Sequence, residues 1–165
     1  MLKMMRALFI SGALAVGLAA PCAWALTPAD QTEIQNFTLT PDFLQRYAAI
    51  TVEAHARHQD TSLDGSDLQS SSLDNLTASI VKRSPQAPSI CQAHGLALRQ
   101  VIVGGLVLAR AAMANQMMAD PKTAKYVDKA KVPSEANMTF FRAHQAQIVA
   151  MFKKAEEVDP AADDK

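Results

Sequence analysis

The segment LALRQVIVGGLVLARAAMANQMM, Leu96 to Met118, is the most apolar part of the chain after its first 25 residues. Its strongly polar side chains are Arg99, Gln100, Arg110, Asn115 and Gln116. Apolar residues therefore cover most of the circumference of a helix with this sequence, and such a helix is usually buried on several sides. The unbroken apolar run, Val101 to Ala109, is far shorter than the roughly 20 residues that a membrane span needs. We expect a core helix and no membrane span.

Two faces of this helix carry different side chains. Arg99 and Arg110 are eleven residues apart, close to three full turns, and share a face that we expect to meet water or an acidic partner. The opposite side carries small residues, namely Gly104, Ala111, Ala112 and Asn115, with Gly105 at its edge. A glycine in a helix interior costs roughly 1 kcal/mol relative to alanine. The two glycines therefore predict the close approach of another helix.

Residues 1–25 have the pattern of a secretory signal peptide. Lys3 and Arg6 form a basic start, Ala7 to Ala20 is almost wholly apolar, and Ala23-Trp24-Ala25 matches a small-x-small cleavage signal. The pattern is typical of bacteria. We expect a mature chain that begins at Leu26 and resides in the periplasm or outside the cell.

Charge and cysteine content exclude some functions of the mature chain. Removal of residues 1–25 leaves fourteen basic and sixteen acidic residues, which is no electrostatic footprint for nucleic acid. Only Cys91 remains, so no disulfide can form within the chain. Free cysteine is among the most buried residue types, and we expect Cys91 to be buried.

The sequence predicts an all-α bundle of four main helices, the central apolar helix included, and one short helix, with the others packed around the central one. We expect an extended arm at 26–39, a helical domain at 40–158 and an acidic tail at 159–165. Besides the central helix, we expect helices from Pro41 to about His58, Leu73 to Arg83, Ala87 to His94, and onward from Ser134. Thr40, Ser72 and Ser134 are suitable N-caps, and Gly95 follows the short helix as a C-terminal glycine. A loop at 59–72 and a lysine-rich connector at 122–131 link these helices.

The last helix carries an apolar stripe that also contains polar residues. We expect its inner face to hold Phe141, Ile148, Met151, Phe152 and Ala155. Asn137 and His144 lie on the same face, seven residues apart. A buried polar group left unpaired costs about 1–3 kcal/mol. Asn137 and His144, with Tyr47, therefore form either a buried hydrogen-bond network or the polar lining of a small ligand pocket.

An alternative interpretation is a metal or haem site. His55 and His58 are three residues apart on one predicted helix, and His144 and Met117 lie on two others. Imidazole and thioether ligands together suit copper, and a helical bundle can hold haem between His and Met. The spacing is nevertheless generic, because the sequence has no C-x-x-C-H and no H-E-x-x-H. The simpler interpretation is that these residues belong to the core or the surface.

No catalytic motif is complete. Ser79-Ile80-Val81-Lys82 matches S-x-x-K, but the companion motifs that this chemistry needs are missing. There is no G-x-S-x-G and no glycine-rich phosphate loop. We therefore predict no catalytic residues and a protein that is not an enzyme.

Short sequence patterns resemble a group of small exported α-helical proteins of bacteria. They are L-T-P-x-x-L-x-R-Y at Leu39 to Tyr47, Ser84-Pro85, H-G-L-x-L-R-Q at His94 to Gln100, and Asn137 with Phe141. The resemblance implies a small all-α exported protein and brings no known active site with it. We expect a non-enzymatic module that binds a protein partner, itself as a homo-oligomer, or a small apolar ligand, without a cofactor. Copper or haem belongs to the alternative interpretation only.

Overall fold

The computed structural model describes residues 26–59, 61, 63 and 71–157, and the regular elements in them are all helical. They are α1 (Pro28–Asn36), α2 (Pro41–Ala56), α3 (Leu73–Arg83), α4 (Ala87–Ala93), α5 (Leu98–Ala119), α6 (Pro121–Ala124), the short 3-10 helix η2 (Lys129–Lys131) and α7 (Glu135–Glu157). The predicted all-α class is confirmed. The signal segment, the acidic tail and most of the loop at 59–72 lie outside the described residues.

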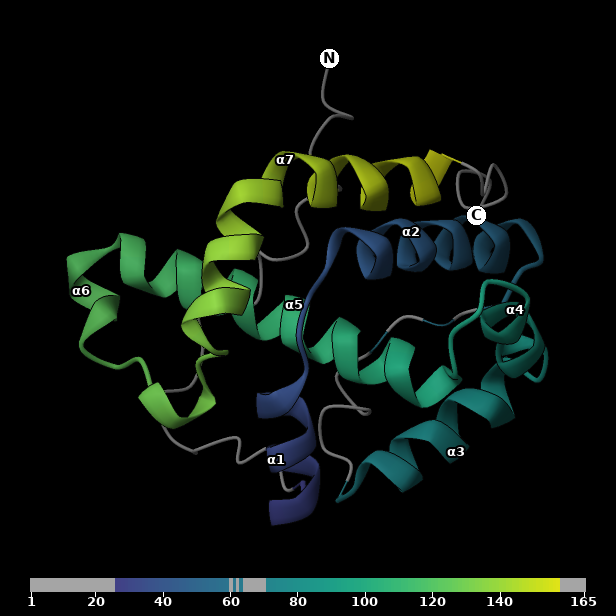
Figure 1. Ribbon diagram of the computed structural model, residues 1–165, viewed down its shortest axis with the longest axis horizontal. Coiled ribbons are helices and arrows are strands. Elements are labelled where there is room, and N and C mark those ends of the chain that lie inside the picture. Colours follow the sequence, from purple (N-terminus) through teal and green to yellow (C-terminus); the bar gives the residue numbers. More distant parts are fainter. Residues whose placement is uncertain (1–25, 60, 62, 64–70, 158–165) are drawn as a thin grey trace, which may run out of the picture.

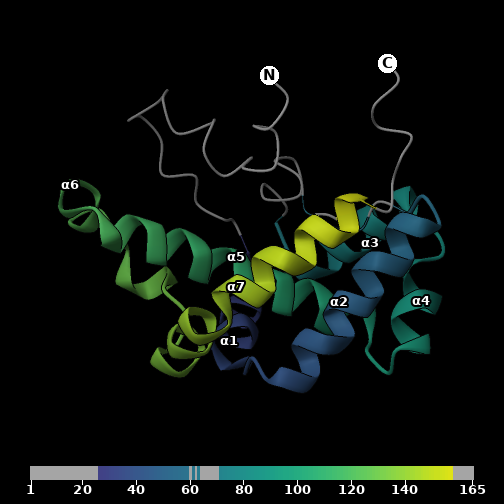
Figure 2. The same cartoon turned by 90° about the horizontal axis from the view of Figure 1, so that it is seen from above.

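Helix α5 runs through the middle of the bundle (Figure 1). Helices α2 and α7 lie on one side of it, α1 and α3 lie on the other, and Figure 2 shows α2 and α7 side by side. In the described part of the chain, α5 alone is long and apolar enough to cross a membrane, and 61% of its most apolar window is buried inside the bundle. That burial agrees with the expected role as a core helix.

The helix ends follow the local signals in the sequence. The Thr40 and Ser72 hydroxyls each accept a hydrogen bond, at 3.1 Å, from the backbone N–H three residues later. Ser134 does the same for Asn137 at 3.3 Å. Gly95 follows α4 with φ of +73°, a conformation that costs glycine nothing. The three predicted N-caps and the terminal glycine are confirmed.

The predicted extended arm at 26–39 is wrong, because most of it forms α1. Thr27 and Asp30 make a capping box: the Thr27 hydroxyl accepts from the Asp30 N–H, and the Asp30 carboxylate accepts from the Thr27 N–H. Pro28 occupies the first turn, where its missing N–H costs nothing. Ile34 and Leu39, at 2% and 4% exposed, anchor the segment in the core.

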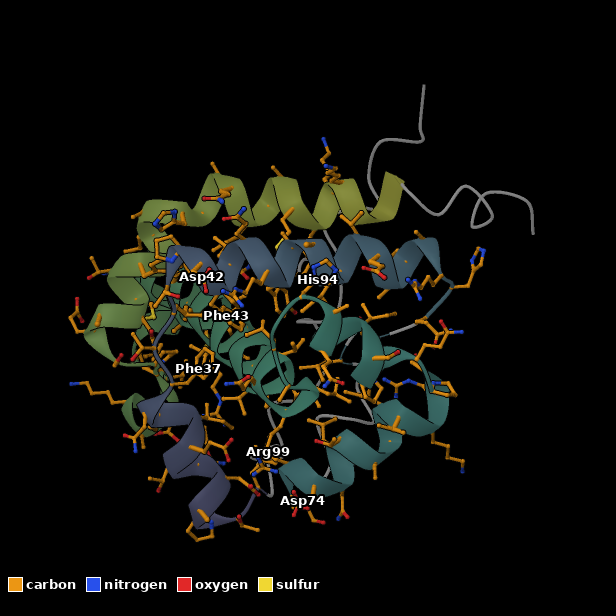
Figure 3. All side chains as sticks on the ribbon, turned by 45° about the vertical axis from the view of Figure 1, so that its right-hand side comes forward. Phe37, Asp42, Phe43, Asp74, His94 and Arg99 are labelled. Atoms are coloured by element: carbon orange, nitrogen blue, oxygen red, sulfur yellow. The ribbon has the colours of Figure 1, made fainter. Side chains whose placement is uncertain are left out.

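Helix α1 covers the arginine face of α5. Arg99 forms ion pairs with Glu33 at 2.7 Å and with Asp30 at 3.2 Å, and a third with Asp74 of α3 (Figure 3). Arg110 donates to the Gln31 side chain at 2.9 Å and is only 4% exposed. The expected acidic partner of this face therefore belongs to the chain itself. The expectation that the face meets water is wrong for Arg110.

The connector and the last helix differ in detail from the prediction. The connector contains α6 and η2, each started by an aspartate that accepts a backbone hydrogen bond: Asp120 from Lys122 at 2.9 Å and Asp128 from Ala130 at 3.1 Å. Phe152 is 42% exposed but its ring packs edge-on against that of Tyr47, with centroids 6.4 Å apart, so it lies at the border of the inner face of α7. The other described members of that face, Phe141, Ile148 and Met151, are buried as predicted. The Ala155 side chain is outside the described part.

The glycines of α5 let two aromatic rings of α2 approach its backbone. A methyl group added at Gly104 would overlap the Phe43 ring, and one added at Gly105 would come within 3.1 Å of the Tyr47 hydroxyl. The two rings lie 5.6 Å apart. The predicted close approach of another helix at the two glycines is confirmed: aromatic rings of α2 occupy the space beside them.

Candidate binding groove

The three polar residues proposed as a ligand set do not form one pocket. Asn137 is 1% exposed and engages the segment between α1 and α2: its Oδ1 accepts from the Leu39 N–H at 2.8 Å, and its Nδ2 donates to the Phe37 carbonyl at 2.7 Å. These bonds use the side chain of Asn137 to fix the start of α7. Of the two interpretations of Asn137, the buried hydrogen-bond network is the one that this geometry matches.

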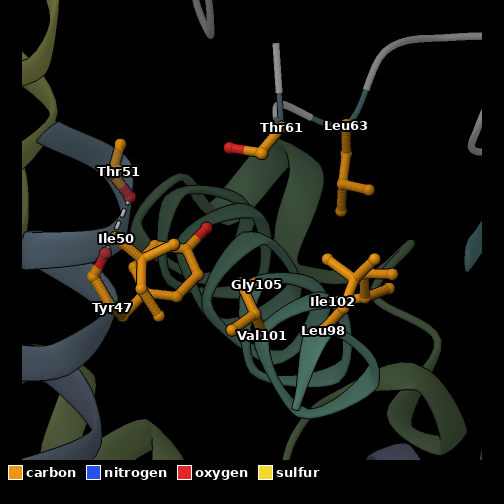
Figure 4. A pocket seen from close by; sticks show the side chains of 9 residues that line it. All are labelled: Tyr47, Ile50, Thr51, Thr61, Leu63, Leu98, Val101, Ile102 and Gly105. Atoms are coloured by element: carbon orange, nitrogen blue, oxygen red, sulfur yellow. Dashed lines mark hydrogen bonds between the residues drawn. The ribbon is translucent and has the colours of Figure 1, made fainter. Parts of the chain in front are cut away.

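His144 and Tyr47 make other contacts than Asn137 does. His144 stacks near Phe140, with ring centroids 4.2 Å apart, and its Nδ1 lies 3.1 Å from the Gln147 amide oxygen. Tyr47 lines a cavity of about 20 Å³ beside Gly105 (Figure 4), which has room for about one water molecule. Burial, with a smaller effect of nearby Cys91, raises the pKa of Tyr47 to about 12.

The residues of the alternative metal site also sit on separate elements. His55 and His58 were expected to face one ion from one helix, but α2 ends at Ala56 and His58 leaves it with φ of +54°. The His55 Nδ1 lies 2.9 Å from the Thr51 carbonyl oxygen. Met117 lies in the last turn of α5, at its C-terminal end. Among the described residues, no three His, Cys, Asp or Glu side chains are grouped to hold a metal. Metal or haem binding stays a prediction.

An open groove lies between α2 and α7. It has a volume of about 380 Å³ and is lined by Ala48, Ala49, Val52 and Glu53 of α2 and by Met151 and Lys154 of α7. Its floor is apolar, and its two charged groups come from different helices. Small side chains at three of the four α2 positions leave the space open.

The charge of Glu53 is compensated outside the groove. Its carboxylate lies 2.6 Å from Nε2 of His94, the residue that follows α4, and pairs at 2.6 Å with Arg57, the residue that follows α2. The hydrogen bond to His94, followed by the charge of Arg57, outweighs partial burial and holds the pKa of Glu53 below its ordinary value. Lys154 is exposed and forms no ion pair with any residue that the structure describes. Among the side chains that the structure describes, Lys154 therefore supplies the charge of the groove that no carboxylate pairs with.

His94 and Glu53 resemble half of a catalytic arrangement, but the nearby thiol is not activated. Cys91 is fully buried, as predicted, and burial raises the pKa of its thiol to about 11. A thiol is a nucleophile only as its thiolate, and this shift disfavours the thiolate. The His94–Glu53 pair therefore acts as a link between α2 and α4.

Sequence reasoning missed every residue of the groove as a site. Met151 was expected only as an apolar packing residue of the last helix, and Glu53 and Lys154 carry no motif. His94 and Glu53 are 41 positions apart, so no local spacing could have paired them. Comparison of the chain with protein-family models, curated proteins and solved structures found no match.

Proposed function

We propose that this chain is an exported, non-catalytic helical module that binds a small amphiphile with an acidic head group in the α2–α7 groove. The observation that carries the proposal is an apolar floor beside the Lys154 ammonium, which pairs with no carboxylate in the described part of the chain. The export part rests on the signal-like residues 1–25.

The size and lining of the groove suit an apolar body. Pockets for small molecules usually measure about 300–1,000 Å³ and are mostly apolar with a few placed polar groups. The groove, at about 380 Å³, is at the small end of this range. Each methylene that leaves water contributes about 0.8 kcal/mol. The flexible Met151 side chain can adapt to chains of different shape.

The charges of the groove favour an anionic head group. A carboxylate beside the Lys154 ammonium gains a charge-assisted hydrogen bond. A cationic head group would meet the same ammonium, and Glu53 would attract it only weakly because Arg57 already compensates that carboxylate. Head-group charge should therefore decide which amphiphiles bind.

Calorimetric titration of the exported protein with dodecanoate tests the head-group contact. Lys154→Gln is expected to weaken binding roughly fivefold, the effect of losing about 1 kcal/mol from an exposed charge pair. Lys153→Gln is the matched control, because Lys153 is exposed but does not line the groove. An equal loss in the two variants, or equal binding of dodecanoate and dodecyltrimethylammonium, would refute the proposed head-group contact.

A second pair of variants tests the apolar floor. Ala49→Phe fills the groove and is expected to abolish dodecanoate binding while thermal unfolding stays close to that of the native chain. Ala56→Phe adds the same ring at an exposed position of α2 outside the groove and is expected to leave binding unchanged. Full binding by the Ala49 variant would show that the amphiphile binds elsewhere.

A further inference from the structure

The end of α5 and the helix that follows it form a corner with exposed apolar side chains. Tyr126 is 63% exposed, Met113 is 44% exposed and Met118 is 40% exposed. Figures 1 and 2 place this corner, marked by α6, at the extremity of the molecule opposite α4. We call the group of Met118, Lys122, Lys125, Tyr126 and Lys129 the basic corner. It is remote from the α2–α7 groove.

Met118 is exposed because the core ends before the apolar stripe of α5 does. Ala111 and Ala114 are buried at 0% and 6% exposed, and Met118 follows on the same side of the helix. Helix α6 turns back there, with the Thr123 hydroxyl donating to the Met117 carbonyl at 2.7 Å. The turn leaves Met118 uncovered and places it on the same end of the molecule as Tyr126. The corner thus carries apolar surface that the described chain does not cover.

The charges of the corner are unbalanced. Between residues 120 and 131 four lysines stand against two aspartates: Asp120 caps α6, and Asp128 caps η2 and lies 3.5 Å from the Lys131 ammonium. Lys122, Lys125 and Lys129 are exposed and form no ion pair with any described residue. The Lys125 ammonium lies 4.9 Å from the Tyr126 ring centroid. The segment that follows α5 therefore carries three exposed ammonium groups together with an exposed tyrosine, and Lys125 lies beside the tyrosine ring.

We infer that the basic corner docks on the surface of an anionic phospholipid bilayer. Lysines near an anionic membrane are attracted by its negative surface potential. Tyrosine favours the headgroup level, where its ring is in apolar surroundings and its hydroxyl is in water, and Met118 adds apolar area. A protein partner fits less well, because lysine is depleted in protein–protein interfaces whereas it is favoured at membrane surfaces.

Co-sedimentation of the exported protein with lipid vesicles tests the inference. Binding is expected to vesicles of mixed phosphatidylcholine and phosphatidylglycerol, to fall with added salt, and to be weak with phosphatidylcholine alone. The variant Lys122→Gln/Lys125→Gln should bind the anionic vesicles roughly thirtyfold more weakly, about fivefold for each lysine. Tyr126→Ser should also weaken binding, and it tests the apolar contribution independently of charge.

The control variant Lys82→Gln/Lys153→Gln removes the same charge from exposed positions on α3 and α7. It should bind the anionic vesicles as the native chain does. The corner variant should still bind dodecanoate, because the groove is elsewhere. Equal losses in the corner and control variants would overturn the inference. A native chain that does not sediment with anionic vesicles would overturn it too, leaving an acidic protein surface as the occupant.

Discussion

Arg99 of α5 and Asp30 of α1 are joined at 3.2 Å, and the Asp30 carboxylate also accepts the backbone N–H of Leu73, at the start of α3, at 3.2 Å. One buried carboxylate thereby connects three helices. Burial alone would raise the pKa of Asp30, but hydrogen bonds from Thr27 and Leu73 and the charge of Arg99 outweigh it and hold that pKa below its ordinary value. The ionised carboxylate of Asp30 therefore stabilises the folded state more than the protonated form does.

Asp30→Ala is expected to destabilise the fold by about 1–3 kcal/mol, because the Leu73 N–H loses its acceptor in a buried place. Glu33→Ala removes a carboxylate that is 41% exposed and should cost less than about 1 kcal/mol. Urea denaturation compares the two. Because the pKa of Asp30 is lowered by folding, its contribution is present above about pH 4 and is lost as the pH falls through the folded-state value. An Asp30 variant with unchanged acid sensitivity would contradict this account.

Asn137→Ala should cost about 2–5 kcal/mol, because it removes the partners of both the Leu39 N–H and the Phe37 carbonyl. Hydrogen exchange of the Leu39 amide should accelerate in the same variant. Asn115→Ala is the matched control: the Asn115 side chain makes one long contact, 3.4 Å from Arg142, and its loss should fall within about 0.5 kcal/mol. Equal effects of the two substitutions would show that Asn137 does not anchor α7.

Gly104→Ala should destabilise the protein by about 1–3 kcal/mol despite the better helix propensity of alanine, because the new methyl overlaps the buried Phe43 ring. Gly105→Ala gains the same propensity and meets only the Tyr47 hydroxyl, at 3.1 Å, so its change should stay within about 1 kcal/mol. Thermal unfolding of the two variants ranks them. A stabilised Gly104 variant would mean that α2 packs less closely on α5 than described.

Cys91 should react with thiol reagents only when the fold opens. It is fully buried, and its thiol has a pKa of about 11, so little thiolate forms at pH 8. In a protein that starts at Leu26 it is the only cysteine, so a chromogenic disulfide reports on it alone. The expected rate in buffer is low and rises with urea in parallel with unfolding. A fast reaction of the native protein would place Cys91 at the surface.

Local signals predicted most helices but failed at α1. Thr40-Pro41 and Ser72 were recognised because apolar periodicity follows them. Thr27-Pro28 has the same chemistry, but α1 carries little apolar periodicity beyond Ile34. Its stability comes from Arg99 and Arg110, which are far away in the sequence. Contacts with distant parts of the chain therefore determine whether α1 forms.

The groove could not be predicted because it belongs to no single helix. Apolar periodicity can place Ala48 on a face of α2, but it cannot say which other helix lies against that face. Which helix lies next to Ala48 depends on the placement of α7, which the Asn137 bonds to Phe37 and Leu39 fix. The charge of Lys154 at the groove likewise follows from packing. Local sequence patterns carry neither fact.

The most direct test of the proposed function is a methyl NMR titration of the exported protein with dodecanoate. The account predicts concentration-dependent shifts at the groove methyl groups of Ala48, Ala49, Val52 and Met151, and none at Met113, which is exposed elsewhere. Shifts should weaken in Lys154→Gln and persist in Lys153→Gln. Absence of shifts at the groove, or shifts confined to Met113, would contradict it.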